Sequence, residues 1–88
     1  MKVKKDFITR TVAGETVIVP TGEATARFNG MITLNETGAF IWRFLQEAHT
    51  KEEVLAAMLE EFEVDEASAR VDIEGFTGAL MEHGMLEA

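Results

Sequence analysis

The stretch Gly30–Trp42 constrains the fold of this chain more than any other part of the sequence. Its first part, Met31–Leu34, has strand character and runs directly into Asn35, whose side chain can accept hydrogen bonds from the N–H groups that open a helix. An amphipathic segment follows at once, with Glu36 in its first turn, where a negative charge complements the helix dipole. The chain before this stretch has β character, and the chain after it is helical to its end. This order predicts an α+β fold, with the stretch as the joint between its two halves.

The first third of the chain predicts a β-hairpin and a third strand. Phe7–Val12 and Thr16–Val19 are rich in β-branched residues, and a compact turn with a glycine separates them. Pro20 suits the end of the second strand because proline cannot donate a hydrogen bond to a ladder. The polar and small residues of Thr21–Gly30 predict a loop, after which Met31–Leu34 provides the third strand.

The remainder predicts three capped helices. The first is capped by Asn35 and runs to about Glu47, and the second begins after Thr50, which forms a capping box with the glutamate three residues later. The third helix is capped by Asp65, and Gly84 is suited to the position just beyond its end. The apolar faces of these helices are, in order, Gly38, Ile41, Phe44, Leu45 and Ala48; Val54, Leu55, Met58, Leu59 and Phe62; and Ala69, Ile73, Phe76 and Leu80.

These elements together predict a single winged-helix-like α+β domain over residues 1–88. An N-terminal three-stranded antiparallel sheet, made of the hairpin and the third strand, is followed by three helices. Eighty-eight residues leave room for one hydrophobic core. The chain contains no cysteine, which excludes disulfides and thiolate metal sites. No apolar run is long enough to span a membrane and no signal-peptide pattern follows the charged N-terminus, so we expect a cytoplasmic protein with no membrane partner.

The formal charge of −8 is concentrated in the helical half. From residue 47 onward, only Lys51 and Arg70 oppose twelve acidic residues. Nucleic-acid affinity comes largely from lysine and arginine, so this distribution argues against one alternative function, a winged-helix nucleic-acid binder. The other alternative is a different protein-interaction module. The acidic half serves either solubility or electrostatic choice of a protein partner.

The sequence offers little for catalysis. Cysteine and tyrosine are absent, and His49 and His83 each lie near a predicted helix end. The acidic residues 60–66 lack the ligand spacing and turn glycine of a calcium site. A metal-dependent or acid–base enzyme would need a convergent set of such groups. We therefore expect a protein that is not an enzyme and that carries no cofactor or metal.

The third helix contains two unusual residues, Gly75 and Gly78. Glycine costs about 1 kcal/mol relative to alanine inside a helix, yet both lie in the middle of this one, on a face shared with Val71 and Glu82 and beside Ala79. A helix face with few side chains lets another backbone approach closely, which predicts the wall of a groove. The alternatives are tolerated variation on a surface helix or close packing against the hairpin.

A family resemblance adds a function to this architecture. The run Leu34–Gly38, continuing to Ile41 and Trp42, resembles the PqqD-like family, named after pyrroloquinoline quinone synthesis protein D. The resemblance covers residues 30–88, and the N-terminal third matches only in its hairpin character. Its structural motif is Asn35, Gly38, Ile41 and Trp42. Further matches follow in order at Thr50, Glu53-Val54-Leu55, Glu61-Phe62-Glu63-Val64-Asp65, Asp72-Ile73, Phe76, Leu80 and Gly84-Met85-Leu86.

The resemblance implies a recognition element for ribosomally made, post-translationally modified peptides. Such a domain binds the leader of a precursor peptide and presents it to a maturation enzyme, often a radical S-adenosylmethionine (SAM) protein. In that family the leader adds as a strand to the third strand and lies against the third helix, a known mode of peptide recognition. The exposed edge strand also leaves homodimerisation open. The implied peptide-binding residues here are Met31, Ile32, Thr33, Leu34, Val71, Asp72, Gly75, Gly78 and Ala79.

Overall fold

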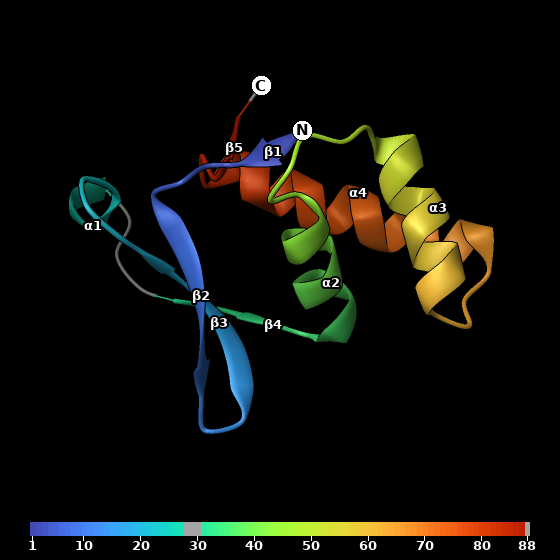
Figure 1. Cartoon of the computed structure of the whole chain (residues 1–88), viewed down its shortest axis with the longest axis horizontal. Helices are drawn as coiled ribbons and strands as arrows, with labels where there is room; N and C mark the ends of the chain where they lie inside the picture. The colour runs from blue at the N-terminus through green and yellow to red at the C-terminus, as the bar shows by residue number, and fades with distance from the viewer. Residues whose placement is uncertain (28–30, 88) are drawn as a thin grey trace.

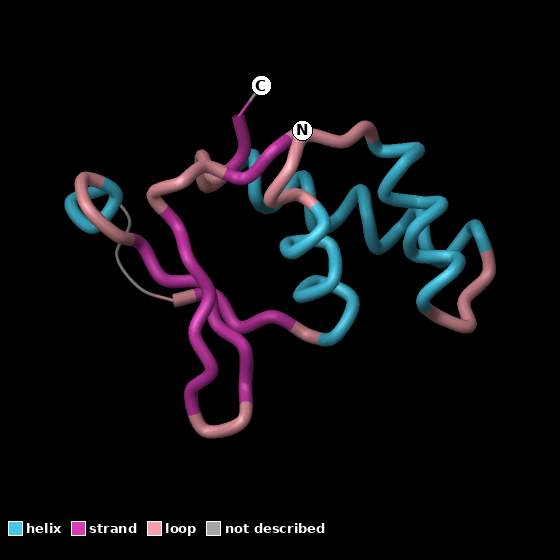
Figure 2. The backbone as a smooth tube through the Cα atoms, viewed as in Figure 1, coloured by secondary structure: helices cyan, strands magenta, loops and turns pink. Residues whose placement is uncertain are grey.

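A three-stranded antiparallel sheet forms one half of the molecule. The computed structural model describes residues 1–27 and 31–87. The sheet consists of β2 (Phe7–Val12), β3 (Glu15–Pro20) and β4 (Ile32–Leu34) in the order β2-β3-β4 (Figure 1). Figure 2 shows these strands on one side and the three longer helices on the other. The predicted α+β order, with a hairpin, a third strand and then three helices, is therefore confirmed.

The hairpin turn follows from two residues with positive φ. Ala13 has φ 52° and Gly14 has φ 83°, and Val12 pairs directly with Glu15. A two-residue turn of this kind has the twist that matches the flanking strands, and glycine adopts it without steric cost. The turn fixes the register of the whole hairpin, from Val12 opposite Glu15 to Phe7 opposite Pro20.

Three helices follow the sheet, each with the predicted cap. They are α2 (Glu36–Phe44), α3 (Lys51–Glu61) and α4 (Glu66–Glu82). The side chains of Asn35, Thr50 and Asp65 accept from N–H groups in the first turns of α2, α3 and α4. The second cap is a full capping box, as expected.

The first helix ends earlier than residue 47, where the sequence placed its end. It stops at Phe44, and Leu45 leaves the helix with its side chain fully buried. The carbonyl of Leu45 accepts a hydrogen bond from the N–H of Val3 at 2.9 Å. This hydrogen bond joins residues far apart in the chain, so the periodicity of the local sequence could not predict it. Ala48 accordingly lies outside the helix and is exposed.

Three short elements were not predicted. A one-turn helix, α1 (Ala24–Arg27), lies in the segment expected to be a loop, and the last three residues of that segment, 28–30, are outside the described residues. Strands β1 (Lys2–Val3) and β5 (Leu86–Glu87) pair antiparallel in a separate two-stranded sheet. Elements of two to four residues are too short to carry a periodic pattern.

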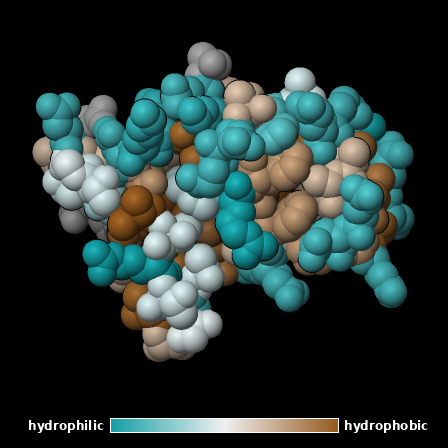
Figure 3. All heavy atoms as spheres, in the orientation of Figure 1, coloured by the Kyte–Doolittle hydropathy of each residue, from teal (hydrophilic) through white to brown (hydrophobic). Residues whose placement is uncertain are grey.

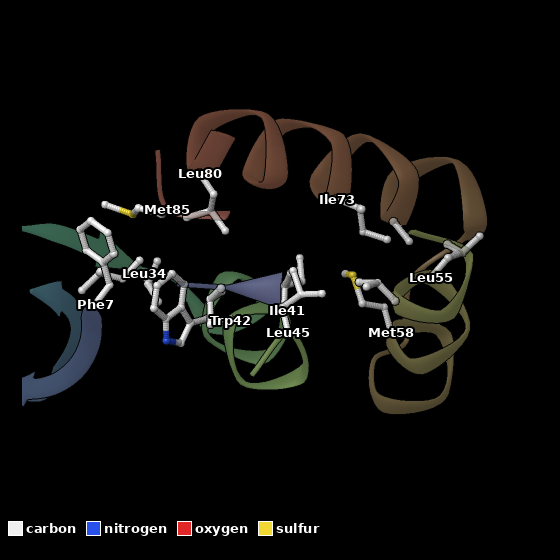
Figure 4. Packing of buried hydrophobic residues seen from close by; sticks show 14 of the residues in the cluster. Phe7, Leu34, Ile41, Trp42, Leu45, Leu55, Met58, Ile73, Leu80 and Met85 are labelled. Carbon is white, nitrogen blue, oxygen red and sulfur yellow. The ribbon is translucent and has the colours of Figure 1, made fainter. Parts of the chain in front are cut away.

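The core lies between the sheet and the helices. Figure 4 shows Leu80 of α4 directed toward Trp42 and Met85 beside Phe7, while Ile73 of α4 points toward Met58 of α3. Thr77 is the buried polar residue among those described, and its hydroxyl donates to the Ile73 carbonyl at 2.7 Å. Most predicted core residues are buried. Phe44, Phe62 and Phe76 are only half-buried, and Leu59 is exposed.

Candidate functional site

A groove of about 250 Å³ runs between β4 and the C-terminal half of α4. We call it the β4–α4 groove. Its walls are mainly apolar, because the half-buried Ile32 and Phe76 and the buried Leu34 and Leu80 contribute to them. The complete lining is Ile32, Thr33, Leu34, Asn35, Phe76, Ala79 and Leu80.

One wall of the groove is the free edge of the sheet. Among the described residues, strand β4 pairs with β3 on one side only, since it is the last strand in the order β2-β3-β4. In a two-residue turn, the N–H after the turn bonds back to the carbonyl before it, so Glu15 directs its main-chain groups toward β2. In an antiparallel strand, the N–H and C=O groups of successive residues point alternately to one side of the strand and to the other. Thr16 and Ile18 therefore direct theirs toward β4.

The register of β4 decides which of its main-chain groups face outward. Leu34 pairs with Thr16 and Ile32 pairs with Ile18, so Leu34 and Ile32 use their N–H and C=O groups within the sheet. Thr33, between them, directs its N–H and C=O to the free edge. An outward-facing donor and acceptor on an edge strand are the groups to which another strand can add.

The other wall of the groove is held in place by Gly38. A Cβ at this position would lie 3.2 Å from Cε1 of Phe76 and 3.1 Å from Oδ1 of Asn35. Only glycine therefore lets α2 approach the ring of Phe76 this closely without displacing a neighbour. Asn35 Oδ1 also accepts from the Gly38 N–H at 2.8 Å. Gly38 therefore takes part both in the cap of α2 and in the packing of the Phe76 ring.

The predicted peptide-binding residues fall into two groups. Ile32, Thr33, Leu34 and Ala79 line the groove, together with Asn35, Phe76 and Leu80, which the sequence assigned to a cap and to the core. The signal that could have found Phe76 is its position on α4, at the edge of the buried stripe and one turn from Ala79. The predicted residues that do not line it are Met31, Val71, Asp72, Gly75 and Gly78, all of them exposed.

The two glycines of α4 face open space. A Cβ built on Gly75 or Gly78 would meet no atom within 4 Å. Close packing of these glycines against the hairpin, one of the alternatives considered from the sequence, therefore does not occur. Val71, on the same face, is 71% exposed. This side of α4 is a bare surface next to the groove.

The sequence matches the family model described as Coenzyme PQQ synthesis protein D (PqqD) over residues 15–86. The chain belongs to the PqqD family. This match confirms the resemblance read from Leu34–Trp42 and extends it through β3. The motif residues of this PqqD-family chain support its fold, because Asn35 caps α2 and the other three, Gly38, Ile41 and Trp42, are buried.

Two solved structures share the fold over nearly their full length. One is TbiB1 in complex with the TbiA(beta) leader peptide, with 25% identity and a TM-score of 0.77, covering 100% of this chain and 96% of that one. The other is lasso peptide synthetase B1 complexed with the leader peptide, with 23% identity and a TM-score of 0.74, covering 99% of this chain and 96% of that one. No curated protein sequence matches.

Ion pairs occupy the basic residues of the helical half of this PqqD-family chain. Arg70 contacts Glu52 at 3.0 Å and Glu66 at 3.0 Å, and Lys51 contacts Glu74 at 3.0 Å. The hydrogen bond from the Arg70 guanidinium lowers the pKa of Glu52 below its usual value. Arg70 is the single lysine or arginine of α4, the helix that would contact bases in a winged-helix nucleic-acid binder, and it is already paired.

Other kinds of site find no support in the described part of the chain. Residues 1–27 and 31–87 contain no group of three or more His, Cys, Asp and Glu side chains placed to hold a metal ion. Over the same residues, no helix is long and apolar enough to cross a membrane.

Proposed function

We propose that this chain is a non-catalytic adaptor that binds the leader of a ribosomally made precursor peptide as an added strand on β4. The observation that carries the proposal is the outward-facing N–H and C=O of Thr33 at the edge of an apolar groove. Both solved relatives of the same fold are complexes with leader peptides.

The geometry suits a strand whose side chains alternate. Main-chain hydrogen bonds to Thr33 would supply affinity without regard to sequence, and every second side chain of the peptide would point into the groove. There it would meet Phe76, Ala79 and Leu80, which line the opposite wall. Burial of an apolar side chain contributes about 1.5–3 kcal/mol, so one or two such side chains can select a leader from other peptides.

The wider set of contacts extends along α4. In our proposal the peptide also passes Met31 at one end of β4 and the bare face of Val71, Asp72, Gly75 and Gly78. The partner that receives the peptide is a peptide-modifying enzyme, and a radical SAM protein is our first candidate because of the family. We place this work in the cytoplasm, where precursor peptides are made.

The decisive test removes a single N–H from the free edge. Thr33→Pro deletes the outward donor of β4, and we expect it to abolish binding of a fluorescently labelled leader peptide from a precursor gene beside that of this chain. Thr9→Pro is the matched control, because the alternation along the hairpin also directs the N–H of Thr9 outward, on the opposite edge. Circular dichroism would establish that both variants fold. Equal binding by the two variants would refute strand addition at β4.

A second variant tests the groove without touching the sheet. Ala79→Arg places a long side chain between the two walls and should weaken binding of the same peptide, whereas Met81→Arg adds the same charge at a site that is already 62% exposed. If Ala79→Arg binds the peptide as well as Met81→Arg does, the groove is not the binding site. A homodimer formed through β4 would use the same edge, so added peptide should dissociate it in size-exclusion chromatography.

A further inference from the structure

A second and larger hollow, of about 450 Å³, lies on the other side of the junction between β4 and α2. It is bounded by the hairpin tip, the N-terminal half of α2 and the C-terminal end of α3, and we call it the hairpin–α3 hollow. Its lining residues are Gly14, Glu15, Thr16, Leu34, Asn35, Glu36, Ala39, Phe40, Arg43, Glu61 and Phe62.

The floor of the hairpin–α3 hollow is aromatic and apolar. Phe40 of α2 and Phe62 at the end of α3 meet edge to face, with ring centroids 5.4 Å apart. Both rings are half-buried, and Leu34 and Ala39 lie beside them in the lining. Figure 3 shows hydrophobic side chains between α2 and α3 surrounded by hydrophilic ones. The accessible parts of half-buried aromatic rings can accept both apolar stems and cations.

The rim carries more negative charge than positive charge. Glu15, Glu36 and Glu61 line the hollow, against one basic residue, Arg43. Within residues 1–27 and 31–87, none of these four side chains forms an ion pair. Three carboxylates around an aromatic floor therefore lack a partner of opposite charge.

The end of α3 shows the same imbalance independently. The C-terminal end of a helix carries partial negative charge and is stabilised by basic residues in its last turn. The last turn of α3 contains no basic residue and ends instead in Glu60 and Glu61. Glu36, by contrast, lies in the first turn of α2, where the dipole favours it. A bound cation near Glu61 would offset the repulsion between this carboxylate and the negative end of the α3 dipole.

We propose that the hairpin–α3 hollow binds a lysine or arginine side chain of the same peptide that adds to β4. This inference rests on the proposed function. Leu34 and Asn35 line both hollows, so a peptide that leaves the groove at this end of β4 reaches the second hollow within a few residues, at about 3.3 Å per residue. The stem of the basic side chain packs on Phe40 and Phe62, and its charge faces the carboxylates of the rim.

The inference defines a class of leader. Its members combine alternating apolar residues, which occupy the β4–α4 groove, with a lysine or arginine a few residues away on the side that passes Asn35. An acidic residue at that position would face Glu15 and Glu61 and would be disfavoured. The acidity of the helical half then contributes to the choice of peptide as well as to solubility.

The test starts from an unbiased probe. A display library of random 16-residue peptides is selected on the immobilised chain. Peptides that bind the parent chain but do not bind the Thr33→Pro variant are kept for analysis. We expect these to carry lysine or arginine at a constant distance from an apolar pair. A retained set without a basic preference would overturn the inference and leave the proposed function standing. A library whose binders are all insensitive to Thr33→Pro, or that yields no binder, would refute the proposed function itself.

A charge-matched pair of variants then locates the basic side chain. With one retained peptide measured by fluorescence anisotropy, the double variant Glu15→Gln, Glu61→Gln should bind roughly 3- to 10-fold more weakly, because two exposed charge interactions are lost. The control Glu60→Gln, Glu63→Gln removes the same charge outside the lining. Replacing the peptide's basic residue with norleucine should make the first double variant indistinguishable from the unmodified chain. Equal effects of the two double variants would overturn the inference.

Discussion

Replacing Gly75 and Gly78 with alanine should stabilise the folded chain by about 2 kcal/mol in total. Alanine is favoured over glycine inside a helix by about 1 kcal/mol per site. Both glycines lie within α4, and a Cβ at either would meet no atom within 4 Å, so no steric cost offsets the gain. For a domain of this size, 2 kcal/mol corresponds to a rise in Tm of roughly 8 to 16 °C.

The same substitution at Gly84 provides a control of opposite sign. A Cβ there would also meet no atom within 4 Å, but Gly84 has φ +69°, a left-handed conformation that costs other residues about 1 kcal/mol or more. Urea denaturation of the variants of Gly75, Gly78 and Gly84 should therefore give two increases and one decrease in the free energy of unfolding. If the free energy of unfolding of the Gly75 and Gly78 variants is unchanged or lower, the prediction that an added Cβ meets no steric cost at these positions is wrong. Because the Gly75 and Gly78 variants should be at least as stable as the parent, any loss of peptide affinity in them would come from the added methyl group.

Three further predictions concern the scaffold. Thr50→Ala removes the capping box of α3 and should lower the free energy of unfolding in urea by about 1 kcal/mol. The Ser68 N–H holds the pKa of Asp65 below its usual value of 3.8. The ionised side chain of Asp65 therefore stabilises the folded state above pH 3.8. This contribution is lost as the pH falls through the lower pKa that Asp65 has in the folded state. Asp65→Asn keeps the cap without the titration, so its Tm should fall less than that of the parent between about pH 5 and about pH 2. Trp42 is 2% exposed, and Trp42→Ala should cost about 3–5 kcal/mol, measurable as loss of the cooperative thermal transition.

The helices were predictable from the sequence because their signals are local. The caps Asn35, Thr50 and Asp65 are each read from one side chain and the N–H groups within three residues of it, and all three are present. The hairpin was predictable for the same reason, through the glycine of its turn. The sequence placed Glu15 in that turn, whereas Glu15 pairs with Val12 as the first residue of β3. The pairing of Val3 with Leu86 was not, because it joins residues from the two ends of the chain and each strand is only two residues long.

The position of the groove could be inferred only in part. The family resemblance implied that the third strand and the third helix face each other, and the structure places Ile32 of β4 and Ala79 of α4 in the same lining. A helical projection assigned Phe76 to the core, because it cannot tell how far the sheet extends over α4. The sheet stops at β4, so Phe76 is left half-buried at the rim. The direction of Thr33's main-chain groups depends on strand register, which no single segment of sequence contains.

The pairing of β1 with β5 also bears on how this domain can be joined to other proteins. Lys2 lies opposite Glu87, so the chain enters and leaves the fold at neighbouring points, and Figure 1 shows these strands well away from β4. A domain with adjacent ends can be inserted into a surface loop of an enzyme, or circularly permuted, with little distortion of its host. Grafted in this way, it would hold a captured peptide at a fixed distance from a chosen active site, and that distance would be set by the two short connections.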